Sequence, residues 1–406
     1  MPTDTIRPDD PASPAPRRSP GCLGQALAVV GWLVALLAAG LLFVPPLQTA
    51  ARTLVLLPSL IEVPIRPLDT LTAEPRRVVT TYGLPADRLD IYLPADARPD
   101  GTRPAVVLAL GVHPPPLDDP DVVRIASSIS RLGVVVGVPD SSALRGTRLT
   151  PAEPRRLADA VIVVADRPEV DSARVGIAGF SAGASVALIA AADARLSGGL
   201  RFVSAFGGYA DADTLIVDVA TRSARFDGLE RPWPADAGVR RDVLELFLSA
   251  LEPRTDVQQL RALLQPVTDA EAPPSGPDAD IASRLRGDAR TAYLVFTAPH
   301  RAEARAALTS ASPALRRQLA EISPLAFADR ILAPVYLLHG ENDRAIPVSH
   351  AEALNAELGL DVVVRFTRFG RFEHGQPGAD GLTVDDAPDV WALTIHLHDI
   401  VAATTE

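Results

Sequence analysis

The chain lacks, or has few of, the residue types that several classes of protein require. Its 406 residues contain no lysine, one cysteine and seven histidines, and the formal net charge is −11. The single cysteine, Cys22, excludes an internal disulfide and a cysteine-based zinc site. The acidic balance argues against a nucleic acid partner, because phosphate binding requires a basic surface. No pair of histidines shows the i, i+4 spacing beside a glutamate that binds zinc, so we expect no metal.

One long apolar segment lies near the N-terminus. Residues 22–44 carry no charge, and a helix of this length reaches about 34 Å, enough to cross a hydrocarbon core of about 30 Å. Residues 1–21, rich in proline, aspartate and arginine, are expected to be disordered. Arg7, Arg17 and Arg18 precede the apolar segment, so the positive-inside rule leaves this tail in the cytoplasm. The sequence predicts a single-pass protein of the cell membrane, with the rest of the chain on the non-cytoplasmic side.

The alternative is a cleaved signal peptide and a secreted product. Thr49-Ala50-Ala51 would serve as the cleavage site, but the apolar run exceeds the roughly 7–15 residues usual for such a segment. Residues 45–70 hold several prolines and a second apolar patch that is too short to span a bilayer. We interpret them as a juxtamembrane linker near the membrane surface.

Residues 71–406 are expected to form one α/β domain with an insertion. Short apolar runs alternate with helical stretches, which is typical of βαβ units and a mainly parallel, doubly wound sheet. Strands are expected at 77–82, 89–93, 105–110, 134–138, 174–178, 201–205, 334–340 and 362–366. Between about 211 and 329 helical periodicity dominates. An insertion there would lie above the carboxyl edge of the sheet, where such folds place the active site. We interpret it as a helical cap, the alternative being a packing element without a role in selectivity.

The segment from Val175 to Ser185 reads VGIAGFSAGAS, and it is the most informative in the chain. It places Gly-x-Ser-x-Gly between an apolar run and a helix-forming run. A strand that turns sharply into a helix exposes the serine hydroxyl, and the flanking glycines remove side chains that would clash. The free N–H groups of the following helix face the position of a developing oxyanion. Ser181 is therefore the predicted nucleophile.

Two later loops offer partners for this serine. A serine nucleophile needs a base, and the base needs an acid that orients it. The loop GENDRAIP, after an expected strand, contains Asp343, and the loop GRFEHG, after the last expected strand, contains His374. The order Ser, Asp, His is the one expected for this kind of turn. Glu341 is the alternative acid.

The segments VDSARVGIAGFSAGASVAL and SPLAFADRILAPVYLLHGENDRAIP resemble the α/β-hydrolase superfamily, in particular its dienelactone-hydrolase and prolyl-oligopeptidase-like branches. The resemblance covers about residues 76–402. It implies an α/β-hydrolase fold and hydrolysis through an acyl-enzyme without a cofactor. By this resemblance Ser181 is the nucleophile, His374 the general base and Asp343 the orienting acid.

One motif departs from the pattern of many relatives. Where they carry His-Gly-Gly after the third strand, this chain reads Gly111-Val112-His113-Pro114. Because Pro114 has no N–H, we expect the backbone of Val112 or His113, together with that of Ala182, to form the oxyanion hole.

These observations predict a membrane-anchored serine hydrolase that cleaves carboxylic esters. The expected partners are a small-molecule ester and, through the N-terminal helix, the membrane. A prolyl-oligopeptidase-like peptidase is the alternative enzyme. A non-catalytic binding protein on the same fold is the alternative outside catalysis, and the presence of all three triad residues in the right order argues against it.

Overall fold

The computed structural model describes residues 44–61, 66–196, 198–251, 256–371 and 383–405. The disordered tail and the transmembrane helix predicted from the sequence lie outside these ranges, apart from Val44. Within them, no helix combines the length and the apolar character needed to cross a bilayer. The chain divides into two compact units, residues 1–51 and 52–406. The second unit contains the whole of the sheet.

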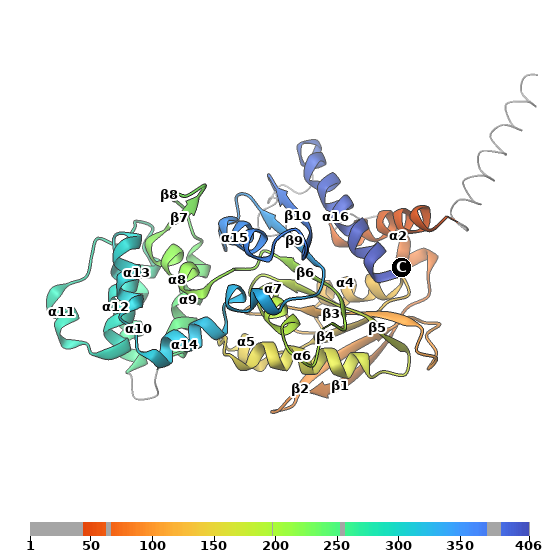
Figure 1. The fold of residues 1–406 in the computed structure, drawn as a ribbon, viewed down its shortest axis with the longest axis horizontal. Coiled ribbons are helices and arrows are strands. Elements are labelled where there is room, and N and C mark those ends of the chain that lie inside the picture. Colours follow the sequence, from red (N-terminus) through yellow and green to blue (C-terminus); the bar gives the residue numbers. More distant parts are fainter. Residues whose placement is uncertain (1–43, 62–65, 197, 252–255, 372–382, 406) are drawn as a thin grey trace, which may run out of the picture. The chain divides into compact units, whose positions relative to one another are not determined.

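Eight strands form one mixed sheet in the order β1-β2-β4-β3-β5-β6-β9-β10 (Figure 1). Strand β2 runs antiparallel to β1 and β4, and all other neighbours are parallel. The strands are β1 (Arg76–Tyr82), β2 (Asp87–Leu93), β3 (Arg103–Ala109), β4 (Val135–Pro139), β5 (Val170–Phe180), β6 (Leu200–Phe206), β9 (Val335–Gly340) and β10 (Val363–Phe369). Each strand expected from an apolar run is present, and the mainly parallel sheet confirms the predicted α/β class.

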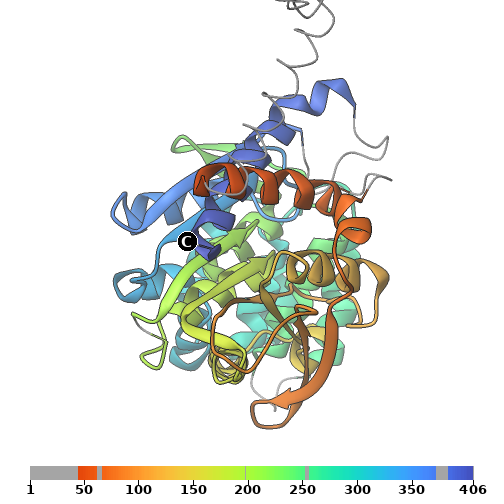
Figure 2. The same cartoon turned by 90° about the vertical axis from the view of Figure 1, so that its right-hand side faces the viewer.

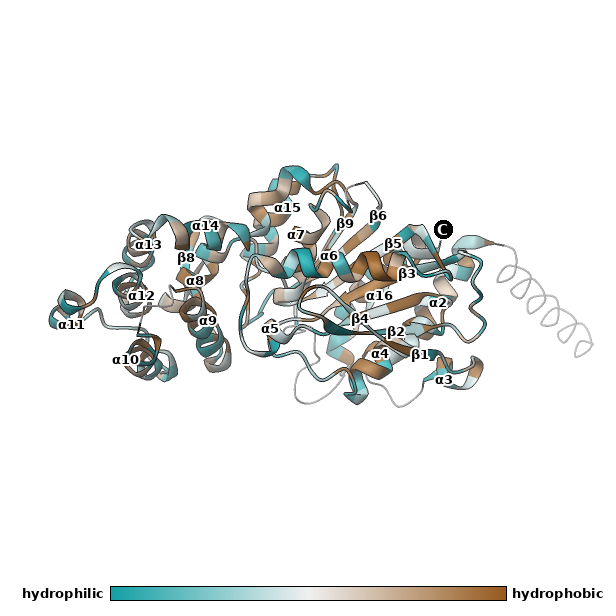
Figure 3. Cartoon of the chain, turned by 90° about the horizontal axis from the view of Figure 1, so that it is seen from below, coloured by the Kyte–Doolittle hydropathy of each residue, from teal (hydrophilic) through white to brown (hydrophobic). Residues whose placement is uncertain are grey.

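Successive side chains of each strand point to opposite faces of the sheet. Both faces carry apolar side chains, and helices cover both. On one face Val106 and Leu108 pack in a cluster with Ala126, and on the other Val107 packs in a cluster with Val161. The helices are α4 (Pro120–Ser130) and α16 (Ala387–Thr405) on the first face, and α6 (Ala152–Ala165) and α7 (Ala182–Ala191) on the second (Figure 2). Apolar residues gather along the central strands, where both faces are covered (Figure 3).

The insertion between β6 and β9 is helical, with one β-hairpin. Its elements are α8 (Ala212–Thr221), β7 (Ser223–Phe226), β8 (Leu229–Pro232), α9 (Ala237–Ser249), α10 (Val257–Asp269), α11 (Ala279–Arg284), α12 (Gly287–Thr297), α13 (Arg301–Thr309) and α14 (Pro313–Glu321). Its interior belongs to the same buried cluster as Val107 and Val161, and in it the rings of Phe247 and Phe296 meet edge to face at 5.7 Å. The helical character predicted for this region is present, whereas the hairpin was not predicted. Its two strands have four residues each, too few for a period to show.

The segment predicted as a juxtamembrane linker contains two helices, α2 (Pro45–Leu60) and α3 (Pro67–Leu71). Proline is tolerated in the first turn of a helix, where the N–H would have no partner within the helix. Leu56 of α2 and Leu68 of α3 are buried against Val401 of α16. Leu56 and Leu68 are therefore packed on α16 of the α/β domain, a contact that the prediction of a linker did not include.

Three further elements follow strands of the sheet or the loops after them. These are α5 (Ser142–Arg145), which follows β4, α15 (Ser349–Leu358), which follows the loop after β9, and the turn η2 (Val384–Asp386), which leads into α16. A turn of 3-10 helix, η1 (Pro324–Arg330), returns the chain from the insertion to β9. The loops that carry the predicted site residues all leave the sheet at its carboxyl edge.

Candidate active site

Ser181 occupies a strained turn between β5 and α7. Its backbone angles are φ 55° and ψ −133°. Residues other than glycine rarely adopt this conformation, which costs of order 1–3 kcal/mol. Phe180 ends the strand and Ala182 begins the helix. The Ser181 amide donates to the carbonyl of Phe206 on β6 at 2.8 Å. The predicted strand–serine–helix elbow is present, and it places the serine at the N-terminal end of α7.

The two glycines of the motif allow the helix to approach the sheet closely. A Cβ on Gly183 would lie 2.4 Å from the carbonyl oxygens of both Ala109 and Leu110, at the end of β3. A Cβ on Gly179 would lie 2.5 Å from the carbonyl oxygen of Gly183. Both positions exclude any side chain. The elbow is therefore packed directly on the end of β3. The loop that follows β3, residues 111–114, is the one predicted to supply an oxyanion donor, and we call it the oxyanion loop.

That loop passes beside the serine hydroxyl. A Cβ on Gly111 would lie 3.4 Å from Ser181 Oγ, so the backbone that precedes Val112 borders the nucleophile. The His113 amide donates to the carbonyl of Leu144 at 3.3 Å. Among the described residues, the amides of Ala182 and Val112 have no backbone acceptor. Of the two alternatives that the sequence left open, Val112 thus has the available N–H.

The side chain of His113 contacts Asp242 of the helical insertion and Thr147. It has a left-handed backbone, with φ 52°, and its ring is half exposed. Its Nε2 lies 3.0 Å from Asp242 Oδ1 of α9 and 3.0 Å from Thr147 Oγ1. This polar contact joins the oxyanion loop to the helical insertion.

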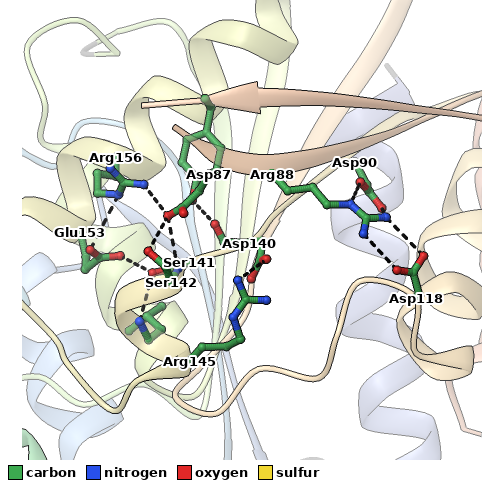
Figure 4. Close-up of polar contacts among 12 residues, drawn as sticks. Asp87, Arg88, Asp90, Asp118, Asp140, Ser141, Ser142, Arg145, Glu153 and Arg156 are labelled. Atoms are coloured by element: carbon green, nitrogen blue, oxygen red, sulfur yellow. Dashed lines mark hydrogen bonds and ion pairs between the residues drawn. The ribbon is translucent and has the colours of Figure 1, made fainter. Parts of the chain in front are cut away.

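A cluster of polar side chains fixes the turn that carries Leu144 (Figure 4). Ser141 Oγ accepts from the Leu144 amide at 3.1 Å and donates to Glu153 Oε2 of α6 at 2.7 Å. Asp87 accepts from the Ser142 amide at 3.2 Å and pairs with Arg156. Burial raises the pKa of the Glu153 carboxyl. The turn is held to β2 and α6, and through Leu144 it holds the oxyanion loop.

Behind this loop is a small cavity. Its volume is about 30 Å³, room for one or two water molecules. It is lined by Tyr82, Ala109, Leu110, Pro114, Pro139, Ser141, Leu144, Glu153, Leu157 and Val186. The cavity is too small for more than a water-sized group.

Asp343 is buried in the loop after β9, with 1% of its surface exposed. Its Oδ1 accepts from the amides of Ala345 at 2.7 Å and Ile346 at 3.0 Å, an arrangement that fixes the carboxylate. The alternative acid, Glu341, is about half exposed, and its carboxylate lies 3.7 Å from Arg368 Nε. Of the two candidate acids, Asp343 is thus the buried one and is held by the backbone of its own loop.

His374 lies outside the described residues, but the chain on both sides of its loop is placed. Strand β10 pairs with β9 so that Phe369 is opposite Gly340, and Asn342 Nδ2 donates to the carbonyl of Gly370 at 2.7 Å. Asp389 of α16 accepts from the amides of Gly370 and Arg371 at 3.0 and 2.7 Å. The chain that leads to His374 therefore starts beside the loop that carries Asp343, residues 341–348, which we call the acid loop.

The sheet order sets how far apart the serine and acid loops lie. Strand β6 alone separates β5, which carries Ser181, from β9, which precedes Asp343. Two strand spacings of about 4.8 Å give roughly 10 Å between the strand ends.

Two structural contributors to the site were not found in the sequence. Leu144 contributes only its carbonyl oxygen, and Trp233, from the insertion, donates its indole N–H to the carbonyl of Asp343 at 2.8 Å. Neither residue lies in a motif, and a contact across 110 positions leaves no local pattern.

No family model and no curated protein matches the chain. Solved structures do resemble it. They include Porphyromonas gingivalis dipeptidyl peptidase 4 (13% identity, TM-score 0.45, covering 80% of this chain and 36% of that one). They also include 2,6-dihydroxy-pseudo-oxynicotine hydrolase (13%, 0.48, 81% and 68%) and a Pyrobaculum calidifontis esterase (18%, 0.43, 87% and 92%). The chain spans about a third of the length of the first of these.

Such distant similarity carries no information about substrate, and the assignment of the fold rests on the molecule itself. The strand order with its single antiparallel β2, the helices on both faces and the elbow at Ser181 are those of an α/β-hydrolase fold. The resemblance predicted from the sequence motifs is confirmed at this level.

Proposed function

We propose that the chain is a serine hydrolase with Ser181 as its nucleophile. The observation that carries this proposal is the backbone of Ser181, held at φ 55° where β5 meets α7. Strain of this kind persists only where the surrounding structure enforces it. Here it presents the hydroxyl at the N-terminal end of a buried helix, where free N–H groups and the helix dipole stabilise negative charge.

In this proposal the catalytic cycle proceeds through an acyl-enzyme. His374 removes the proton from Ser181 Oγ as the oxygen attacks the substrate carbonyl, and it returns that proton to the leaving group. The amides of Ala182 and Val112 hold the oxyanion. Water, activated by the same histidine, then releases the acid. Asp343, fixed by two backbone amides, orients the imidazole and stabilises its protonated form.

Carboxylic esters are the substrate class that we propose. An ester requires less protonation of its leaving group than an amide does, so it demands least of the machinery just described. Peptide hydrolysis is the competing activity and is decided by the same experiment with peptide substrates.

We further propose that residues 22–44 anchor the enzyme in a membrane, with the hydrolase domain on the non-cytoplasmic side. The support is the length and uncharged character of this segment together with the arginines before it. If the chain is anchored, it stays with the membrane fraction after alkaline carbonate extraction. Release of the full-length chain by carbonate would contradict the anchor.

The test uses a fluorophosphonate, which reacts covalently with activated serines, and p-nitrophenyl acetate as the ester. We expect labelling and turnover by the full chain, and neither by Ser181→Ala. Asp343→Asn should slow both by about 10³–10⁴-fold, as expected when the orienting acid is lost. Glu341→Gln is the matched control, the same carboxylate-to-amide change two positions away on an exposed side chain, and it should react like the wild type. Equal rates for the wild type and Ser181→Ala would refute the proposal.

A further inference from the structure

Residues 233–236, between β8 and α9, form a short strap that joins the helical insertion to the acid loop. Trp233 is buried, and its indole N–H donates to the Asp343 carbonyl at 2.8 Å. The Asp236 amide donates to the Arg344 carbonyl at 3.0 Å, and Arg344 Nε donates to the Pro234 carbonyl at 3.0 Å. Three hydrogen bonds thus connect three residues of the strap to two residues of the acid loop.

The strap is itself held firmly on the side of the insertion. Arg240 of α9, with 4% of its surface exposed, donates to the carbonyl of Ala235 at 2.5 Å and to the carbonyl of Thr268 at 2.6 Å. The Trp233 amide donates to the carbonyl of Arg222 at 2.8 Å. Because two other parts of the insertion fix the strap, its contacts with the acid loop have a defined position.

These contacts fall on the residue whose orientation matters most for the proposed chemistry. The main-chain carbonyl of Asp343 accepts from Trp233, while its carboxylate accepts from the amides of Ala345 and Ile346. The peptide group and the side chain of one residue are therefore each restrained by hydrogen bonds. Precise placement of a catalytic group needs supporting contacts of this kind.

We propose that Trp233 is a positioning residue for catalysis, and that the insertion sets the geometry of the acid as well as covering the site. This inference rests on the proposed serine hydrolase function. It assigns to the insertion a role in rate that a substrate-shaping cap alone would not have.

The test replaces the indole by a ring that cannot donate. Trp233→Phe keeps an aromatic side chain and removes one N–H. The matched control is Trp391→Phe, the same change on α16, where 65% of the residue is exposed. We expect Trp233→Phe to lower kcat for p-nitrophenyl acetate and the fluorophosphonate labelling rate by about tenfold, the upper range for one hydrogen bond. KM should stay within about twofold, since the acid does not contact the substrate. Trp391→Phe should match the wild type.

The same substitution made in the Asp343→Asn variant separates positioning of the acid from general destabilisation. If Trp233 acts through Asp343, then Trp233→Phe should have almost no further effect on the labelling rate of Asp343→Asn. The same tenfold loss in both backgrounds would show that Trp233 acts independently of the acid and would overturn the inference.

Arg344→Gln provides a variant that does not disturb the interior. It removes the hydrogen bond to Pro234 and the ion pair with Asp236 Oδ1 at 3.1 Å, both made by a side chain that is about half exposed. We expect labelling to slow by about two- to fourfold. Wild-type rates for both Trp233→Phe and Arg344→Gln would overturn the inference while leaving the hydrolase intact. If the wild type itself neither labels nor turns over, the proposed function fails and the role of Trp233 in catalysis fails with it.

Discussion

Gly183→Ala tests whether the close approach of α7 to β3 supports the site. The added methyl would lie 2.4 Å from two backbone carbonyl oxygens, those of Ala109 and Leu110. Real Cβ contacts stay beyond 3.0 Å, so the helix and the strand end must separate by at least about 0.6 Å. Both neighbours are backbone atoms of central elements and cannot rotate away. Overpacking of this kind costs about 1–3 kcal/mol, and we expect the upper end of that range.

The same displacement moves the oxyanion loop, because Leu110 leads directly into Gly111 beside Ser181 Oγ. A misplacement approaching 1 Å can reduce catalysis about a hundredfold, so we expect the fluorophosphonate labelling rate to fall by about that factor. Urea unfolding of the full chain measures the free energy of unfolding.

Gly238→Ala is the control, since no atom of another residue lies within 4 Å of a Cβ at this position in α9. There the loss of glycine's conformational freedom should stabilise the protein by up to about 1 kcal/mol. If Gly183→Ala kept both the urea midpoint and the labelling rate of the wild type, the packing argument for the elbow would be refuted.

Two predictions concern the dependence of stability on pH. Burial and, next, Asp211 raise the pKa of Asp213 from 3.8 to about 6, so its charge destabilises the fold increasingly as pH rises from 3.8 through 6. Asp213→Asn should therefore stabilise the protein at pH 7.5 by about 1 kcal/mol, once the partial exposure of the group is allowed for, and the gain should vanish below pH 4. A gain of the same size at both pH values would contradict this account. Burial and, next, Arg365 lower the pKa of His396 from 6.5 to about 3, so stability is lost as pH falls below 6.5. Between pH 7.5 and 5 the wild type should lose about 2 kcal/mol that His396→Gln does not lose. Parallel urea midpoints for these two proteins over that range would rule it out.

The sequence predicted the serine side of the site because the relevant physics is local. A sharp strand-to-helix turn needs glycine on both sides of Ser181, and those residues are consecutive in the chain. The acid was predicted for a related reason. Asp343 follows a recognisable buried strand, and its hydrogen bonds to Ala345 and Ile346 are made within its own loop.

The contacts that the sequence could not predict are all made between distant segments. Whether the His113 or the Val112 amide is available depends on the carbonyl of Leu144, which belongs to α5. The burial of Leu56 and Leu68 in the predicted linker does not follow from the local sequence either, because it depends on packing against Val401 of α16. Hydrophobic periodicity reports which residues are buried within an element, but it does not report which element covers them.

Ser181 and Asp343 of the proposed triad are therefore supported in different ways. Ser181 is fixed by its own turn and by the packing of α7 on β3, and this support is contained within the α/β domain. Asp343 is fixed partly from outside that domain, because Trp233 of the insertion holds its peptide group. A change in the insertion that moves the strap should consequently lower the rate for every substrate, whereas a change elsewhere in the insertion should alter only which substrates are accepted. The ratio of rates for two esters then distinguishes these cases, since a displaced acid leaves the ratio constant while a reshaped pocket changes it.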